Sequence, residues 1–288
     1  MKTDLTQNLS RGKSTMKLVL FLAVLALAGP GFSQGQQKRP EPGTISPDAT
    51  SDCQSTFTSG SGQTFLQFCV TVNGNITELQ SPAGYEHIRV GFYEEGYGIC
   101  DFGTTTGSET GYFDYADGGD SGNWQNPVTT QPGGVNTFPL KIVRTTSDGV
   151  YTLTQTFTRD TVEPTVKIAM TLKNNTKAAR DFALVRFADI DANNGYDDSI
   201  DLFDFTHDAA WGYNNGFTLY GVMLFTVPTT LPHFAFVQDT FEGPDPCGPV
   251  NNLPASTPWS GDGSVGLEWN NTVNNAKSIA ATAEYRRF

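Results

Sequence analysis

The sequence is poor in basic residues and has almost no histidine. Its 288 residues include 18 Lys or Arg against 30 Asp or Glu, which gives a net charge of −12. A surface of this charge repels phosphate groups, so we exclude nucleic acids as partners and expect no attraction to anionic lipids. The three histidines, His87, His207 and His233, show no H-x-H or H-E-x-x-H spacing, and a three-histidine zinc site would require all of them to converge.

The sequence also lacks the local motifs of several enzyme classes. Residues 36–288 contain no G-x-S-x-G nucleophile motif, and no Walker A motif occurs in the chain. The four cysteines form no C-x-x-C pair, which argues against a zinc site made of thiolates. No amphipathic helical pattern and no repeat of fixed period stand out. No motif therefore identifies a catalytic site.

A single long apolar run, Leu18–Ala28, lies near the N-terminus and follows two lysines. It has the length of a secretory signal and is too short to span a bilayer comfortably. We predict a cleavable signal peptide at 1–33, a disordered spacer rich in Pro and Gly at 34–52, and one folded domain at 53–288. The protein is then secreted, periplasmic or on the cell surface, with no stable membrane insertion after cleavage.

The cysteines favour disulfides. An even number in an exported chain predicts two bridges, and four cysteines allow three pairings. Cys53 and Cys69 are close in sequence, so we favour Cys53–Cys69 as a local bridge. Cys100–Cys247 would then join an early strand to a late loop rich in proline.

Alternation of apolar and polar residues is the main structural signal. In Thr165–Asn174 every second residue is apolar, which predicts a strand with one face on a core, and Phe182–Ile190 reads as a strand buried on both faces. About a dozen strands with frequent turns predict an all-β fold, a large antiparallel sandwich of the supersandwich type. A hairpin is expected from Thr64–Val72 through the turn Asn73–Asn75 to Ile76–Gln80. Further strands are expected at Tyr97–Phe102, Leu140–Thr145, Val150–Arg159, Ser199–Thr206, Phe217–Val227, His233–Phe241, Ser264–Trp269 and Lys277–Tyr285.

An acidic loop follows the second of these strands and is a candidate calcium site. Asp189, Asp191 and Asn193 have the i, i+2, i+4 spacing that lets side-chain oxygens converge on a hard cation, and Asp197 and Asp201 could complete the shell. The loop departs from the EF-hand pattern in the position of its glycine, and it lacks the glutamate that serves as the last ligand of an EF-hand. The alternative is a solvated acidic turn in which Asp189 or Asp191 pairs with Arg186. A weaker cluster consists of Asp114, Asp117 and Asp120.

Aromatic residues are candidates for ligand binding. Exposed indole rings that could stack on a sugar are sought among Trp124, Trp211, Trp259 and Trp269, of which Trp124 and Trp211 are the candidates. The alternative is that both belong to the core, as most Trp residues in β-proteins do. Acidic residues are too numerous for a catalytic carboxylate pair to be picked out, because only the distance between two carboxylates identifies such a pair.

Two segments resemble a known group of proteins. VKIAMTLKNNTKAARDFALVRFADID (Val166–Asp191) is similar to a segment of uncharacterised exported bacterial proteins, and GYGICD (Gly96–Asp101) resembles their glycine-rich strand. These proteins are grouped with the supersandwich of galactose-mutarotase-like proteins. The resemblance implies that fold and no particular activity. A mutarotase-like enzyme would need a Glu and a His around a sugar, and the sequence assigns neither.

The sequence as a whole favours a non-catalytic exported β-sandwich that binds a glycan or a cell-surface protein, with a calcium-braced acidic loop. The alternative is a carbohydrate-active enzyme of the mutarotase, lyase or hydrolase kind on a supersandwich. An outer-membrane barrel is a third interpretation, suggested by the alternating strand that ends at Phe288, although Arg286 holds the third-last position, where such barrels have an aromatic residue.

Overall fold

The computed structural model describes residues 52–88, 95–103, 109–116, 119–160, 164–192, 201–214, 220–240, 242–248 and 259–288, with only the backbone described for 201–204. The predicted signal peptide and all but the last residue of the spacer lie outside these residues. Within them the chain forms strands and one short 3-10 helix, η1 (Gly62–Thr64). No helix in the described part of the chain is long and apolar enough to cross a membrane.

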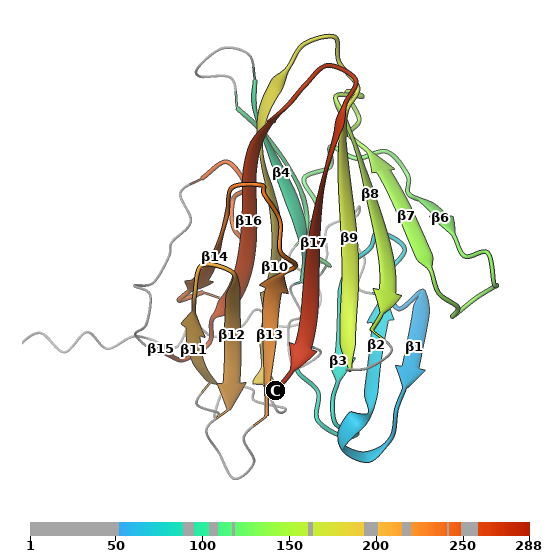
Figure 1. Ribbon diagram of the computed structural model, residues 1–288, viewed down its shortest axis with the longest axis vertical. Helices are drawn as coiled ribbons and strands as arrows, with labels where there is room; N and C mark the ends of the chain where they lie inside the picture. Colours follow the sequence, from blue (N-terminus) through green and yellow to red (C-terminus); the bar gives the residue numbers. More distant parts are fainter. Residues whose placement is uncertain are drawn as a thin grey trace, which may run out of the picture. The chain divides into compact units, whose positions relative to one another are not determined.

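The larger layer is a nine-stranded antiparallel sheet. Its order is β15-β11-β12-β13-β17-β9-β8-β7-β6, and Figure 1 shows β12, β13, β17, β9, β8 and β7 side by side. The strands are β6 (Val128–Thr130), β7 (Leu140–Thr145), β8 (Tyr151–Arg159), β9 (Thr165–Asn174), β11 (Asp201–Phe205), β12 (Ala209–Asn214), β13 (Gly221–Thr226), β15 (Trp259–Ser260) and β17 (Ser278–Arg287).

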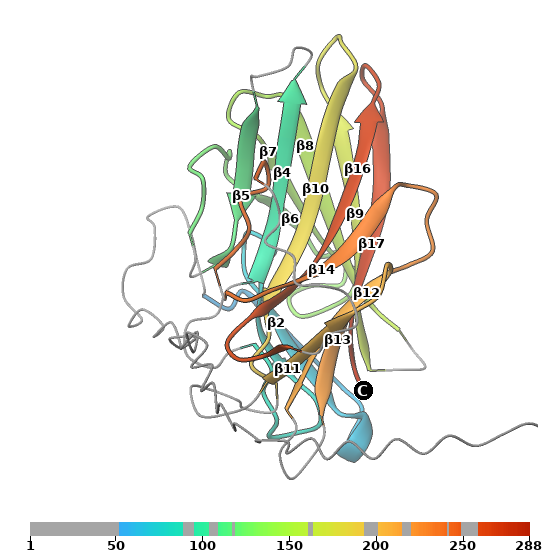
Figure 2. The ribbon, with the colours of Figure 1, turned by 90° about the vertical axis from the view of Figure 1, so that its left-hand side faces the viewer.

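The second layer is a five-stranded antiparallel sheet of order β14-β16-β10-β4-β5. Figure 2 shows β5, β4, β10 and β16 side by side, with strands of the larger sheet behind them. The strands are β4 (Glu95–Gly103), β5 (Thr110–Asp114), β10 (Arg180–Asp189), β14 (His233–Gln238) and β16 (Ser264–Val273). The predicted all-β antiparallel sandwich is confirmed.

A third sheet, of order β1-β2-β3, consists of β1 (Ser55–Ser59), β2 (Leu66–Val70) and β3 (Ile76–Gln80). The predicted hairpin between β2 and β3 is present, and its turn includes Asn73–Asn75. Cys53 and Cys69 form the predicted local disulfide, which ties the segment before β1 to β2. The bridge closes a loop of modest length, for which a stabilisation of about 3 kcal/mol is typical.

The core lies between the two large sheets. In β9, Val166, Ile168, Met170 and Leu172 are all 0% exposed, whereas Lys173 is exposed, as the alternation predicts. The two sheets contribute to one cluster of buried apolar side chains, to which β16 adds Trp269. Strands of β-branched and aromatic residues form here because one apolar face of each sheet can be removed from water only against the other.

β10 is buried on both faces, as predicted, yet it carries a charge. The Arg186 side chain is 0% exposed and points between the sheets, where its Nε donates to Glu95 Oε1 at 2.6 Å and its Nη1 donates to Gln155 Oε1 at 2.7 Å. Tyr285 also donates to Glu95 Oε1, at 2.6 Å. A buried ion pair is tolerated when hydrogen bonds satisfy both partners, as they do here.

The outer face of the five-stranded sheet is covered near β4 and β5 by the segment 242–248. The predicted Cys100–Cys247 disulfide fixes this segment to β4, and Tyr115 Oη donates to the carbonyl oxygen of Pro244 at 2.6 Å. Gly98 allows the close approach, because a Cβ atom there would lie 3.0 Å from Pro246 Cβ and 2.8 Å from Tyr115 Oη. The segment therefore packs directly on the glycine-rich part of the strand.

The structure has more strands than the sequence predicted. β9 and β7 have the predicted bounds, whereas β1, β5, β6, β12 and β15 were not predicted. The unpredicted strands are short or contain Gly, Asn or Asp. Such residues have low intrinsic strand propensity, and pairing with a neighbouring strand outweighs that preference.

Candidate functional site

The acidic loop after β10 brings three carboxylates together. Asp189, Asp191 and Asp262 offer ligand oxygens that all lie within 4.8 Å of one another. Asp189 is 0% exposed and Asp191 is 2% exposed, while Asp262 is half-exposed in the turn between β15 and β16. Three negative charges at this spacing repel one another strongly in a buried setting, and a bound cation removes that repulsion.

Buried neutral oxygens lie on the strands next to Asp189 in the sheet. Asp189 pairs across the sheet with Ser264, and Ser264 pairs with Gln238, so the three side chains lie on one face of neighbouring strands. Among the described residues, Ser264 Oγ and Gln238 Oε1 are buried and accept or donate no hydrogen bond. Buried polar atoms almost always have a partner. Together with the carboxylates they form a set made only of oxygen, the ligand type that calcium prefers.

The predicted loop supplies only part of this cluster. Asp189 and Asp191 were predicted. Asn193 and Asp197 lie outside the described residues, and for Asp201 only the backbone is described. The suggested pairing of Asp189 or Asp191 with Arg186 is wrong, because the Arg186 guanidinium points to the opposite face of β10 and binds Glu95. Asp262 was missed. Its signal is the G-D-G turn just before a strong strand pattern.

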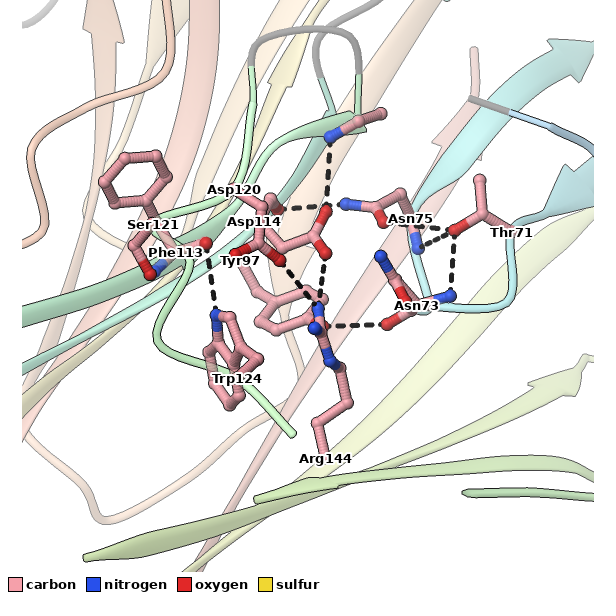
Figure 3. Close-up of polar contacts among 12 residues, drawn as sticks. Thr71, Asn73, Asn75, Tyr97, Phe113, Asp114, Asp120, Ser121, Trp124 and Arg144 are labelled. Carbon is pink, nitrogen blue, oxygen red and sulfur yellow. Dashed lines mark hydrogen bonds and ion pairs between the residues drawn. The ribbon is translucent and has the colours of Figure 1, made fainter. Parts of the chain in front are cut away.

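A second cluster of carboxylates lies between the sheets at the end of β5 (Figure 3). Arg144 on β7 forms ion pairs with Asp114 and, at 3.2 Å, with Asp120. Its Nη1 also donates to Tyr97 Oη at 3.2 Å. Arg144 is 5% exposed, and the carboxylate side chains of both partners are 0% exposed. The two aspartates of the weaker predicted cluster therefore meet around a guanidinium, and Asp117 lies outside the described residues.

The pKa of Asp114 is unusually high because its carboxyl group is buried. Burial raises the pKa of Asp114 to about 7, the nearby Asp120 adds to the rise, and Arg144 opposes it. The backbone around Asp114 is also fixed, since Asn75 Nδ2 donates to the Asp114 carbonyl oxygen at 2.9 Å. The Asp114 carboxyl group therefore changes protonation near neutral pH.

Trp124 borders the same cluster. Its indole Nε1 donates to the Phe113 carbonyl oxygen at 3.1 Å, and the guanidinium carbon of Arg144 lies 5.0 Å from its ring centroid. Tyr97 contacts it edge to face at a centroid distance of 5.6 Å. The ring thus packs on Arg144 and Tyr97 from within the fold, and it is only half-exposed.

Trp211 lies in a different setting, on the outer face of the nine-stranded sheet. Ala210, beside it on β12, is 0% exposed and points to the core, so alternation turns Trp211 outward. Its cross-strand neighbour is Met223 on β13. Apolar residues of β12, β13 and the C-terminus continue this row. We call them the aromatic strip, which consists of Trp211, Tyr213, Met223, Phe225 and Phe288.

The strip is ordered by local packing. The Phe288 ring meets Tyr213 at a centroid distance of 6.3 Å and lies over Gly221, where a Cβ atom would come within 2.5 Å of Phe288 Cζ. Arg286 places its guanidinium carbon 4.9 Å from the centroid of Phe225. Beside it, Lys167 and Glu284 form an ion pair of 3.1 Å. Half-exposed rings with charged groups at their edge thus share one outer face.

Comparisons with known proteins give a fold and no family. No protein-family model and no curated protein matches the sequence. Among solved structures, a bacterial glucoamylase complexed with acarbose is 11% identical with a TM-score of 0.52, over 86% of this chain and 34% of that chain. A polysaccharide lyase is 10% identical with a TM-score of 0.49, over 80% and 33%. A heparinase III is 9% identical with a TM-score of 0.43, over 84% and 36%.

The chain spans about a third of the length of each of these proteins. At 11% identity the glucoamylase shares a fold with this chain. The comparisons do not confirm the resemblance to mutarotase-like proteins. The chain is thus an all-β sandwich with the fold of a part of a bacterial glucoamylase structure.

Proposed function

We propose that the protein is an exported carbohydrate-binding β-sandwich that holds a glycan on the aromatic strip. The observation that carries this proposal is the set of half-exposed rings on one outer face, with Trp211 and Tyr213 on β12 and Phe225 on β13. Apolar side chains on a sheet face usually turn toward a core, and an outward cluster of them indicates a binding surface.

The chemistry of the strip fits a sugar. A pyranose ring presents C–H groups on its faces and hydroxyl groups at its edge. Aromatic rings provide a flat apolar surface for the first, and Trp and Tyr carry polar atoms that hydrogen-bond the second. Arg286, Lys167 and Glu284 lie at the border of the strip and offer charged donors and an acceptor to hydroxyl groups. The fold shared with the glucoamylase is consistent with this proposal.

The compartment is part of the proposal. Two disulfides fit an extracellular or periplasmic protein, because thiols stay reduced in the cytosol. The predicted signal peptide at 1–33 would deliver the chain there. A glycan outside the cytoplasm, or a glycan carried by a cell-surface protein, is then the natural partner.

The test is a glycan-array screen on the mature protein, followed by calorimetry with the best ligand. Trp211→Ala is expected to weaken binding about tenfold or more, equivalent to about 1.4 kcal/mol. Val135→Ala is the matched control, because Val135 is 74% exposed in a loop far from β12 in the sheet order. Wild-type affinity in a folded Trp211→Ala variant, or no retained glycan at all, would contradict the proposal.

A structural calcium ion is a second element of the proposal. Asp189, Asp191 and Asp262 would bind it directly, with Ser264 Oγ and Gln238 Oε1 as neutral ligands. The ion would fix the end of β10 to the turn before β16. Its role here is to stabilise the fold, and the carboxylates that bind it take no part in binding the glycan.

A carbohydrate-active enzyme is the alternative function, favoured by one observation. Asp114, with a pKa raised to about 7, is suited to general acid catalysis near neutral pH, and Asp120 is a second carboxylate beside it. However, both side chains are fully buried around Arg144, so a substrate has no direct contact with them. Release of reducing ends from polysaccharides by the wild type, and its loss in Asp114→Asn, would favour this alternative over simple binding.

A further inference from the structure

Two of the three histidines converge at a place that the glycan-binding proposal does not use. The ring centroids of His207 and His233 are 4.7 Å apart, and His233 Nε2 lies 2.7 Å from Asp208 Oδ1. Nitrogen and oxygen atoms of the three side chains lie within 4.8 Å of one another. His87 is elsewhere. It is 0% exposed, and its Nε2 lies 2.7 Å from the Ser81 carbonyl oxygen, so the three histidines do not form one site.

The backbone holds this group in place from both sheets. His207 and Asp208 form the turn between β11 and β12 of the larger sheet, and His233 begins β14 of the smaller sheet. The amide of Ala235 donates to the His207 carbonyl oxygen at 3.0 Å, and the amide of Thr226 donates to the Asp208 carbonyl oxygen at 2.9 Å. Each side chain therefore starts from a fixed position, which lowers the entropy cost of binding an ion.

The backbone fixes one ring nitrogen of His233 and leaves the other directed at Asp208. Its Nδ1 lies 2.7 Å from the Leu231 carbonyl oxygen, to which it can only donate a hydrogen. In the neutral ring this leaves the lone pair on Nε2, the atom that faces Asp208. A backbone carbonyl that holds one ring nitrogen while the other binds a metal is the usual arrangement around metal-binding histidines.

We propose that His207, Asp208 and His233 bind a divalent transition-metal ion of the zinc type. Two imidazole nitrogens and one carboxylate oxygen form a donor set that suits zinc and disfavours calcium, which prefers oxygen alone. The Asp208 side chain is 67% exposed and His233 is 10% exposed, so an ion can enter from solvent. Water completes the coordination. The bound ion links the two large sheets where β12 and β14 approach each other.

The experiment uses mature protein whose purification tag has been removed, because a histidine tag would bind the same ions. Cobalt is titrated and followed by its visible absorption, zinc is then added as a competitor, and melting temperatures are compared in zinc and in chelator. The wild type is expected to bind one ion and to melt at a higher temperature with zinc. His207→Ala is expected to weaken binding about tenfold or more and to remove the zinc-dependent shift.

Control variants test whether the zinc response comes from this group of side chains. His207 is exposed, so His207→Ala should melt like the wild type in chelator, which shows that folding is intact. Asp262→Asn alters the acidic cluster after β10 and should leave the zinc response unchanged. Absence of a cobalt spectrum and of a zinc-dependent shift in the wild type would overturn the proposal. So would equal responses of the wild type and His207→Ala, and Asp208 would then only form an exposed ion pair with His233.

Discussion

Two groups of aspartates in this fold differ in how their charge is balanced. Asp114 and Asp120 meet around Arg144 between the sheets, where a side chain of another strand supplies the positive charge. Asp189, Asp191 and Asp262 gather at the end of β10, where the nearest predicted cation, Arg186, points to the other face of the strand. Two groups of aspartates thus have different outcomes, an internal ion pair in one region and a candidate ion site in the other.

The largest expected effect on stability comes from removing the cation of the first group. Arg144→Met removes the guanidinium and leaves two buried carboxylates without it, which is expected to lower the free energy of unfolding by about 3–5 kcal/mol. Urea denaturation of the mature protein measures this change. Lys141→Met is the matched control, because Lys141 is exposed on the same strand, and its effect should stay within about 0.5 kcal/mol. A loss below about 1 kcal/mol for Arg144→Met would show that the cluster is unimportant for stability.

Calcium tests the second group. At a free calcium concentration of about 100 times the dissociation constant, the ion should stabilise the fold by about 2.7 kcal/mol, and chelator should remove this gain. Asp262→Asn should abolish the effect while the variant stays folded, since Asp262 is half-exposed. Asp208→Asn serves as the control and should respond to calcium as the wild type does. Melting curves that are identical in calcium and chelator would leave the acidic cluster as a solvated turn.

The pH dependence of stability sharpens the contrast. Burial raises the pKa of Asp114 to about 7, above its value of 3.8 in an unfolded chain. The folded state therefore favours the protonated carboxyl group, and this contribution is complete below about pH 4 and is lost as the pH rises through about 7. We expect Asp114→Asn to reduce the fall in stability between about pH 5 and 8 by roughly 1–3 kcal/mol. Urea midpoints measured across this range would show parallel curves if Asp114 did not titrate there.

The smallest expected effect concerns the aromatic neighbour of the first group. Trp124→Phe keeps an aromatic ring near Arg144 and removes the hydrogen bond from Nε1 to the Phe113 carbonyl oxygen. The expected loss is about 1 kcal/mol. Denaturation of Trp124→Phe and of the double variant with Arg144→Met would give the coupling between the two side chains. A coupling of zero would mean that the contact of Trp124 with Arg144 contributes nothing.

The sequence predicted the fold better than the sites. Alternation places β9 at Thr165–Asn174, because the side chains of a strand that face the core are every second residue in the sequence. Asp189 and Asp191 are also local, and their proximity was predictable. Asp262 and Arg144 contact their partners because strands far apart in the sequence pair or pack together, and a local sequence pattern does not predict such contacts. β12 was missed because its Gly and Asn residues have low strand propensity, so the sequence did not place the candidate Trp211 on a strand.

Segment 242–248 decides which side of the sandwich can receive a large ligand. Cys247 is bonded to Cys100 and Pro246 packs on Gly98, so this segment covers the outer face of the five-stranded sheet near β4 and β5. On the outer face of the nine-stranded sheet, no described segment covers Trp211 and Phe225 in this way, and both remain half-exposed. Among the described residues, the five-stranded sheet is thus covered on its outer face near β4 and β5, while the outer face of the nine-stranded sheet leaves these rings in contact with solvent.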